Sequence, residues 1–292
     1  MKKIAKWGSG LVIAIAMMFM AGQAGAVELG CYETGQLVPK AYHDGANVDT
    51  VVGISCINQL GCDVYWTFFD NNSTHITDGM FEMTANDYQG FSWKTESGVG
   101  LEGVDGYLVF TSGTSAIMPM PTGTADIVAN SFMVDVAGKD AIVIPVVPLN
   151  GADYNPGMID LEHLGAADII GLSYGSAPGN TLDIRYWTDP AYSASTTVVL
   201  WSVCNVEGIY TVNMFNDDEE RKSVNFELEN QELNLMDPSI IPGTPADFVD
   251  GFIRFDVPPA TCGGGEINDM FVFSYVNSDS IGAVQTMLAG EK

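Results

Sequence analysis

Residues 63–69 read Asp63-Val64-Tyr65-Trp66-Thr67-Phe68-Phe69, a run of aromatic and β-branched residues. Turn-forming residues follow as Asp70-Asn71-Asn72-Ser73, and then a second run, Gly79-Met80-Phe81-Glu82-Met83-Thr84. Two such runs around a polar turn are typical of a β-hairpin. Side chains alternate between the two faces of a strand, so one face can be buried while the other meets water. This stretch predicts antiparallel β-structure.

The hairpin pattern occurs a second time in the chain. Residues 210–228 again contain an apolar run, a polar loop and an alternating strand. Val104-Asp105-Gly106-Tyr107 parallels Val249-Asp250-Gly251-Phe252, and residues 128–149 align with 267–288 at a constant offset. Such a collinear series predicts a duplicated unit. Superposition should bring Phe81 onto Phe226, Gly106 onto Gly251 and Phe132 onto Phe271.

We therefore expect an all-β chain of two tandem, sequence-related antiparallel β-sandwich domains, at 27–149 and 181–292. Short strands with Gly and Pro between them are typical of a sandwich. The segment 150–180 has no counterpart in the second unit and is expected to connect the domains, with a short helix at Pro156–Leu164. Further strands are expected at 106–111, 131–136, 141–147, 181–187, 197–204, 251–256, 270–276 and 282–287.

The first 26 residues have the three parts of a secretory signal. A basic start, Met1–Lys6, precedes the apolar run Leu11–Met20, and Ala24-Gly25-Ala26 supplies small residues for cleavage. The apolar run is about half of the roughly 20 residues that a membrane-spanning helix needs. The pattern predicts a cleaved signal peptide, no transmembrane helix in the mature chain, and export by the Sec route to the periplasm, cell surface or medium.

The charge balance restricts the partners. The chain has 292 residues, with 11 Lys and Arg against 37 Asp and Glu, which gives a formal net charge of −26. Nucleic acids and anionic membrane surfaces are polyanions that would repel such a chain. We expect a protein or glycan partner outside the cytoplasm, and no nucleic acid.

The five cysteines are candidates for disulfides in an exported protein. Cys204–Cys262 is the natural pair in the last part of the chain, which leaves Cys31, Cys56 and Cys62, one more than a pair needs. Leu29-Gly30-Cys31 partly resembles a lipobox, and lipidation of Cys31 would leave four cysteines. A buried thiol or an intermolecular bridge are the alternatives. The sequence leaves this choice open.

A serine esterase is a minor alternative. Gly171-Leu172-Ser173-Tyr174-Gly175 fits the G-x-S-x-G nucleophile elbow, which needs a helix after it and a later histidine as base. The chain's histidines all precede Ser173. The nearest is His163, which would need Asp160 or Glu162 to orient its ring. We expect no catalytic residue and no enzyme.

Calcium is the one cofactor that the sequence suggests, because carboxylates are its preferred ligands. The candidate ligands lie in two acidic loops: Asp70, Asn72, Asp78, Asp217 and Asp218. In the first loop, His75 stands where an EF-hand needs Gly and Phe81 where it needs Glu. A loose site in either loop competes with the simpler interpretation of solvated hairpin tips.

Carbohydrate binding is a further hypothesis, because exposed aromatic rings stack on sugar rings. The candidate ligand-binding residues are Trp93 and Trp187. The alternative is that these rings are part of the core, as most sandwich aromatics are.

The sequence thus predicts a non-enzymatic structural, adhesive or partner-binding protein of the envelope or surface, with self-association as an option. Edge strands offer such a protein a route to partners by strand addition. A calcium- or carbohydrate-binding extracellular module is the alternative.

Overall fold

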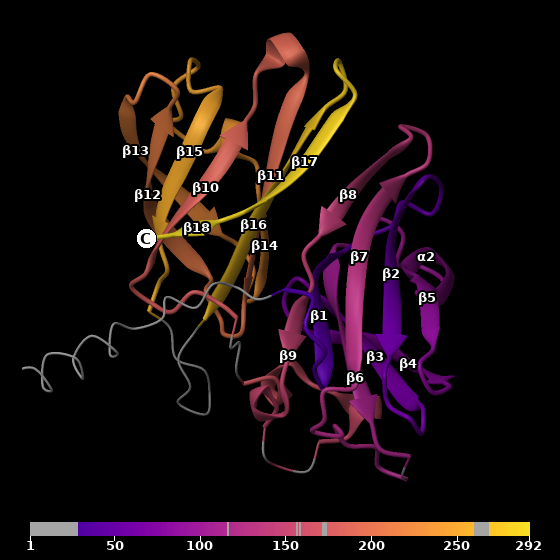
Figure 1. Ribbon diagram of the computed structural model, residues 1–292. Helices are drawn as coiled ribbons and strands as arrows, with labels where there is room; N and C mark the ends of the chain where they lie inside the picture. The colour runs from indigo at the N-terminus through magenta and orange to yellow at the C-terminus, as the bar shows by residue number, and fades with distance from the viewer. Residues whose placement is uncertain (1–28, 116, 156, 158, 171–173, 260–268) are drawn as a thin grey trace, which may run out of the picture.

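The computed structural model describes residues 29–292 except 116, 156, 158, 171–173 and 260–268. The predicted signal peptide, 1–26, lies outside the described residues. Antiparallel strands make up most of the chain (Figure 1), and the described part has one α-helix, α2 (Trp93–Glu96). None of the described helices is long and apolar enough to cross a membrane. The predicted all-β class is confirmed.

The first half of the chain forms a β-sandwich, which we call the first sandwich. Its two sheets have the strand orders β4-β3-β6-β1-β9 and β5-β2-β7-β8. The strands are β1 (Gly35–Ala41), β2 (Val48–Cys56), β3 (Cys62–Asp70), β4 (His75–Met83), β5 (Tyr88–Ser92), β6 (Gly106–Gly113), β7 (Ile127–Asp135), β8 (Asp140–Ile144) and β9 (Val147–Leu149).

The second half forms the second sandwich. Its sheets have the strand orders β13-β12-β15-β10-β18 and β14-β11-β16-β17. The strands are β10 (Thr181–Trp187), β11 (Ala194–Ser202), β12 (Gly208–Asn216), β13 (Arg221–Leu228), β14 (Leu233–Met236), β15 (Asp250–Asp256), β16 (Met270–Ser278), β17 (Ala283–Leu288) and β18 (Gly290–Glu291). Two 3-10 helices lie between them, η5 (Pro190–Tyr192) and η6 (Pro238–Ile240).

The strand order is the same in both sandwiches: adding nine to each strand number of the first gives the order of the second. Strand registers agree as well. Gly106 pairs with Asp70 as Gly251 pairs with Asn216, and Phe81 pairs with Val64 as Phe226 pairs with Tyr210.

One of the expected matches is less consistent with the ladders. Phe132 pairs with Val51, whereas Phe271 pairs with Trp201. If Phe132 is equivalent to Phe271, their partners Val51 and Trp201 are equivalent too. The match of Cys56 with Cys204 instead makes Val51 equivalent to Val199, two residues earlier in β11. Both side chains still lie on the outward face of their sheets, because a shift of two preserves the face.

Each sandwich has buried residues between its own sheets. In the first, Trp66 and Phe68 from one sheet pack against Phe91 and Trp93 from the other side, with ring centroids 4.3–6.1 Å apart. In the second, Leu182, Ile184, Val212, Phe226 and Ile253 belong to a separate core cluster. The residues named in the second sandwich alternate along their strands with more exposed ones, as the sandwich prediction requires.

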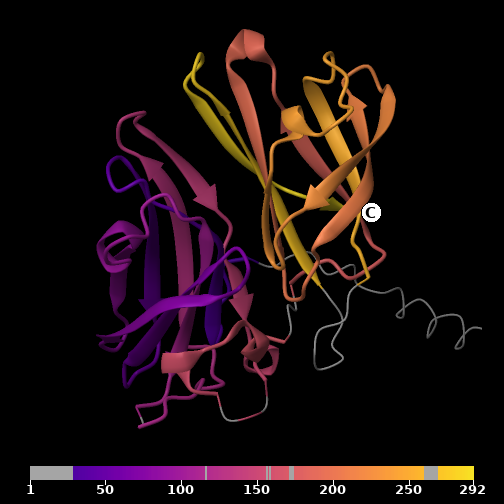
Figure 2. The same ribbon diagram turned by 180° about the vertical axis from the view of Figure 1, so that it is seen from behind.

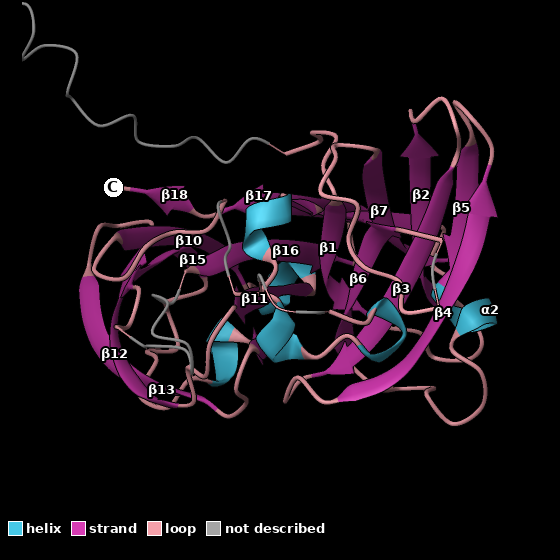
Figure 3. Cartoon of the chain, turned by 90° about the horizontal axis from the view of Figure 1, so that it is seen from below, coloured by secondary structure: helices cyan, strands magenta, loops and turns pink. Residues whose placement is uncertain are grey.

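The two sandwiches also share a buried contact (Figures 1 and 2). The outward face of β11, β14 and β16 contributes Val199, Trp201, Leu233, Phe271 and Phe273 to the same apolar cluster as the first sandwich. Seen from below, β11 and β16 lie between the other sheet of their own sandwich and β1 (Figure 3). The middle of the five-stranded sheet of the first sandwich is thus covered on both faces, and every residue of β1 and β6 is buried, whereas the edge strand β4 keeps an exposed side.

The connecting segment packs on the same five-stranded sheet. Tyr154 is buried and its hydroxyl lies 2.8 Å from Thr111 Oγ1, and Leu161 and Ile169 are buried beside it. The segment contains three single-turn 3-10 helices, η2 (Gly151–Asp153), η3 (Leu161–His163) and η4 (Ala166–Asp168). The helix expected at Pro156–Leu164 is reduced to η3, with Pro156 and Met158 outside the described residues.

A disulfide joins Cys56 at the end of β2 to Cys62 at the start of β3, with Cα atoms 6.1 Å apart. This pair takes two of the first three cysteines, and half-buried Cys31 is the third. Cys204 is also disulfide-bonded. Its expected partner, Cys262, lies outside the described residues, so Cys204–Cys262 stays a prediction.

Candidate functional site

In the first candidate calcium loop, which follows β3, the carboxylate of Asp70 stabilises a turn. Asp70 Oδ1 accepts hydrogen bonds from the backbone amides of Asn72 and Thr74, both at 2.9 Å. Asp78 lies on β4, and its Oδ1 is 3.1 Å from His75 Nε2. In the second loop, Asp217 and Asp218 are exposed at the turn after β12. A side-chain oxygen bonded by two amides is a turn cap, and it needs no cation to explain it.

Acidic and histidine ligand atoms of the described residues converge within 4.8 Å elsewhere, at Asp160, Glu162 and His163. Asp160 caps η3 by accepting from the Glu162 amide at 3.2 Å, and its other oxygen lies 2.8 Å from His163 Nδ1. The hydrogen bond to Asp160 raises the pKa of His163. The contacts are those of a capped helical turn, and none of the five predicted ligands belongs to this group.

This group includes the base that the esterase alternative would need. Asp160 does contact the His163 ring, as that alternative requires, but Ser173 lies outside the described residues. No distance from His163 to the hydroxyl can therefore be compared with the 2.6–3.2 Å that proton transfer requires.

Trp93 is placed where no sugar can reach it, which corrects the expectation of a binding role. Its side chain is 0% exposed, stacks on Phe68 at 4.3 Å and meets the edge of His43 at 6.1 Å. As the first residue of α2 it turns inward after Ser92, whose side chain caps the helix. Position 93 is a core position because the helix starts at the sandwich edge.

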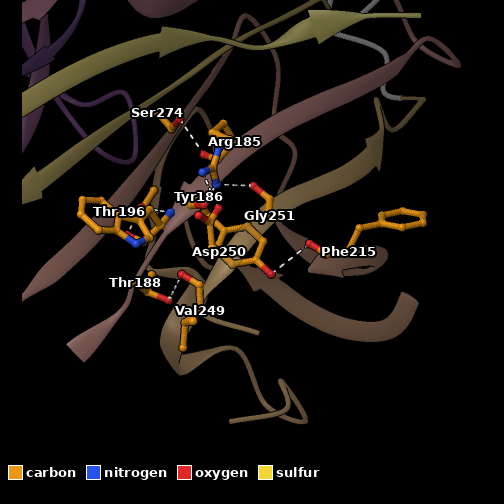
Figure 4. Close-up of polar contacts among 10 residues, drawn as sticks. Arg185, Tyr186, Thr188, Thr196, Phe215, Val249, Asp250, Gly251 and Ser274 are labelled. Carbon is orange, nitrogen blue, oxygen red and sulfur yellow. Dashed lines mark hydrogen bonds and ion pairs between the residues drawn. The ribbon is translucent and has the colours of Figure 1, made fainter. Parts of the chain in front are cut away.

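Trp187 is half-buried at the end of β10. Its ring centroid lies 5.5 Å from that of exposed Tyr192. Its backbone amide donates to Thr196 Oγ1 at 2.8 Å, and the same hydroxyl donates back to the Trp187 carbonyl at 2.7 Å. Nearby, Arg185 forms an ion pair with Asp250 (Figure 4). The two rings form a small aromatic surface. Neither ring lines any of the three hollows described below.

An open apolar surface of the first sandwich is the outward face of β5-β2-β7-β8, which sequence reasoning missed. We call it the uncovered face, because the described part of the chain does not cover it. Tyr88 is 66% exposed, Phe132 40% and Val143 52%. The residues on this face include Val51, Gly53, Ser55, Tyr88, Gly90, Asn130, Phe132 and Val143.

A hollow of about 540 Å³ opens on the uncovered face, between the rings of Tyr88 and Phe132. Two glycines shape it. Gly53 pairs with Gly90 and with Asn130 in neighbouring strands, so the middle of the face has little side-chain volume. A Cβ at Gly53 would lie 2.4 Å from the Tyr88 hydroxyl, so this glycine lets the Tyr88 ring lie across the strand. Glycines inside strands often mark such a close approach, and this is the signal that could have revealed the site.

The lining of this hollow carries no charge, although the chain as a whole is very acidic. Its residues are Val51, Val52, Gly53, Tyr88, Gly90, Phe91, Ser92, Asn130 and Phe132. Two other hollows differ in this respect. One of about 610 Å³ in the second sandwich includes Glu227, Glu229 and Asp237, and one of about 410 Å³ between the sandwiches includes Asp135, Asp140 and Asp279.

The equivalent face of the second sandwich is buried instead of exposed. On β14-β11-β16-β17, Trp201 is 1% exposed and its ring meets the edge of Tyr107 at 5.6 Å. The Leu233 amide donates to the Asn71 carbonyl at 3.3 Å. One four-stranded face is therefore buried against the first sandwich, and its counterpart in the first sandwich faces outward.

A buried carboxyl lies at the edge of this contact. Glu232 Oε2 accepts from the Tyr107 hydroxyl at 2.8 Å, and the same hydroxyl is 3.0 Å from Ser73 Oγ. Burial raises the pKa of Glu232 to about 7. Burial and the Glu232 charge also raise the pKa of Tyr107 well above its ordinary value. Neutral pH is therefore where the charge at this junction changes.

Comparison with known proteins gives no family. No protein-family model matches the chain, and no curated protein sequence matches it. Solved structures match weakly. A deletion mutant of Bacillus subtilis oxalate decarboxylase has 10% identity and a TM-score of 0.20, over 85% of this chain and 67% of that one.

Two further structures show the range of these matches. The apo form of Pleurotus ostreatus lectin has 11% identity and a TM-score of 0.20, over 91% of this chain and 78% of that one. A Bacteroides uniformis β-glucuronidase has 9% identity and a TM-score of 0.16, over 91% of this chain but 27% of that one. These scores are too low to carry an argument about fold or function.

Proposed function

We propose that the chain is a non-enzymatic binding protein of an extracytoplasmic compartment, with a structural or adhesive role, and that it binds a protein partner through the uncovered face. One observation carries the proposal. The four-stranded face of the second sandwich is buried in a contact within the chain, while the same face of the first sandwich exposes Tyr88, Phe132 and Val143. Exposed aromatic groups around an uncharged hollow are typical of interaction surfaces.

Two further features support an extracytoplasmic location. The Cys56–Cys62 disulfide is of a kind that persists in oxidising compartments. The first 26 residues have the pattern of a secretory signal. We take the tandem sandwiches as the product of a duplication, supported by the shared strand order and by the paired positions of Gly106 and Gly251.

The test is photo-crosslinking in cells that make the full chain. Tyr88 is replaced by the photoreactive residue benzoylphenylalanine, and Leu60, which is 97% exposed and outside the face, is replaced in a control chain. We expect ultraviolet light to give covalent protein adducts from position 88 and few from position 60. Absence of adducts from 88, or equal adducts from both positions, would overturn the proposal.

A second candidate function, carbohydrate binding, is favoured by one observation. Two exposed rings, Tyr88 and Phe132, and the Asn130 side chain line the hollow, and rings with a nearby amide suit a sugar. Adducts that carry added hexose mass, together with saturable binding of a sugar that Phe132→Ala abolishes, would favour this candidate over a protein partner.

A further inference from the structure

We propose that the chain self-associates head to tail, with the uncovered face of one copy packed on the outward face of β10, β12, β13 and β15 in the next copy. This inference rests on the proposed function and deepens it, because it names the partner as a second copy of the chain. We call the second surface the arginine face, after Arg185, Arg221 and Arg254 on its strands.

The contact inside the chain supplies the pattern. There, the five-stranded sheet of the first sandwich receives the four-stranded sheet of the second. Phe69 and Tyr107 stack at 5.0 Å on the receiving sheet, and Trp201 of the incoming sheet meets Tyr107. Because the two sandwiches have the same strand order, the same kind of contact would join one copy to another.

The receiving surface of that pattern exists a second time. On the arginine face, Phe215 and Phe252 stack at 4.6 Å with an angle of 8° between the rings. Phe215 and Phe252 are paired across β12 and β15 as Phe69 and Tyr107 are across β3 and β6. In the first sandwich the stack is buried by the second. In the second sandwich the stacked rings are half-buried and lie beneath the Arg254 guanidinium at 5.4–5.5 Å.

Charge favours these two surfaces over the rest of the molecule. Strands β10, β12, β13 and β15 carry four basic residues, Arg185, Arg221, Lys222 and Arg254, against four acidic ones, Asp183, Glu227, Asp250 and Asp256. The hollow of the uncovered face has no charged lining. Strands β2, β7 and β8 carry Asp49, Asp135 and Asp140 outside that hollow. Two copies with a net charge of −26 repel each other, and the repulsion is weaker where an uncharged hollow meets a face whose strands carry equal numbers of basic and acidic residues.

The two surfaces are small. Their strands have five to nine residues, so each face covers at most roughly 19 Å by 30 Å. Mating two such faces would bury about 1,100 Å² in total, which is the low end for a specific interface. We expect reversible association in the micromolar range or weaker. Since the two faces differ, the contact is heterologous, and it builds chains or rings instead of a closed dimer.

The experiment uses two blocked variants of the full chain. Phe132→Glu places a charge on the uncovered face, and Phe252→Glu places one on the arginine face. Val143→Glu and Thr211→Glu repeat each block at exposed positions, in case loss of a ring disturbs folding. Leu60→Glu is the matched control, which adds the same charge outside both faces.

Sedimentation velocity then measures the mass of each sample over a range of concentrations. We expect the wild type and Leu60→Glu to grow in mass with concentration, and each blocked variant to associate at least tenfold more weakly. An equimolar mixture of the two blocked variants retains one intact pair of faces, so it should form dimers and stop there.

Three results would overturn the inference. The wild type could stay monomeric at all concentrations, the blocked variants could associate like the wild type, or the mixture could fail to dimerise. If protein adducts still form at position 88 and none contains a second copy, the self-association fails while the binding function stands. If no adduct forms, the proposed function itself fails.

Discussion

Gly106 and Gly251 are needed because backbone lies where a side chain would go. A Cβ at Gly106 would lie 2.2 Å from the Phe69 carbonyl oxygen, and one at Gly251 would lie 1.8 Å from that of Phe215. Both glycines pair with the residue that begins the turn after the long central strand. The same local crowding therefore explains why both halves carry an Asp-Gly-aromatic motif.

We expect Gly106→Ala and Gly251→Ala each to lower the free energy of unfolding by about 1–3 kcal/mol, the usual cost of forcing an extra group into a packed site. Denaturant titration of the full chain measures this. Gly290→Ala is the control, since its nearest neighbour would be 4.0 Å away, and it should change stability little. Equal midpoints for all three variants would contradict the explanation.

At this scale the sequence predicts side-chain chemistry better than exposure. Trp93 is a candidate for a surface ring in the sequence, yet it is buried and meets the buried Trp66 ring edge to face at 6.1 Å. Tyr88 and Phe132 form the open surface because they lie on the outward side of β5 and β7, which is uncovered. Which side that is depends on where the other sandwich packs, and the sequence of one strand does not contain this information.

The disulfide between β2 and β3 acts on an element, the short loop that connects the two sheets of the first sandwich. It closes a loop of seven residues, for which chain entropy predicts a stabilisation of about 2 kcal/mol. We expect the double variant Cys56→Ser/Cys62→Ser to lose about that much in denaturant unfolding. Gln59→Ala, within the same loop, should cost far less, and a similar loss in both variants would point to loop packing instead of the cross-link.

Most strands are predictable because their apolar residues alternate or cluster between turns. The expected strand 181–187 agrees with β10, and 251–256 differs from β15 by one residue. Strand β1 escapes prediction because its sequence, with Gln36, Pro39 and Lys40, looks polar. It is fully buried nonetheless, since Gln36 donates to the Ile127 carbonyl at 2.9 Å and Lys40 pairs with Asp105.

The sequence of the strands at the junction between the sandwiches is unusually apolar, and the structure explains why. Strands β11 and β16 contain the continuous apolar runs 198–201 and 270–273, where β13 alternates. Continuous runs belong to strands buried on both faces. The runs indicate that the second face of these strands is covered. They do not show whether a partner protein or the neighbouring sandwich covers it, because both would require the same apolar pattern.

For the whole molecule, Glu232 couples the junction to pH. Its pKa is raised from an ordinary value of 4.5 to about 7, mainly by burial, so the folded chain holds this proton more tightly than the unfolded chain. The contribution of this group to stability is therefore fully present below about pH 4.5 and is lost as the pH rises through 7.

We expect the wild type to lose up to about 3 kcal/mol of stability between pH 5 and pH 8 through this group. Glu232→Gln keeps the shape without the charge, so it should be more stable than the wild type at pH 8 and about equal at pH 5. Thermal melts across this range measure the difference. Glu229→Gln, a neighbouring acid whose carboxyl is not at the junction contact, is the control, and parallel curves for Glu232→Gln and wild type would contradict the assignment.

The shared apolar cluster also makes the order of synthesis matter. Strands β1–β9 are complete before the ribosome has made β11, β14 and β16, which cover the five-stranded sheet. Until then Leu37, Tyr107 and Val109 have only the connecting segment above them. A chain that stops before residue 194 would therefore leave the apolar face of this sheet exposed and prone to aggregation. The last third of the protein covers that face only after it has been synthesised.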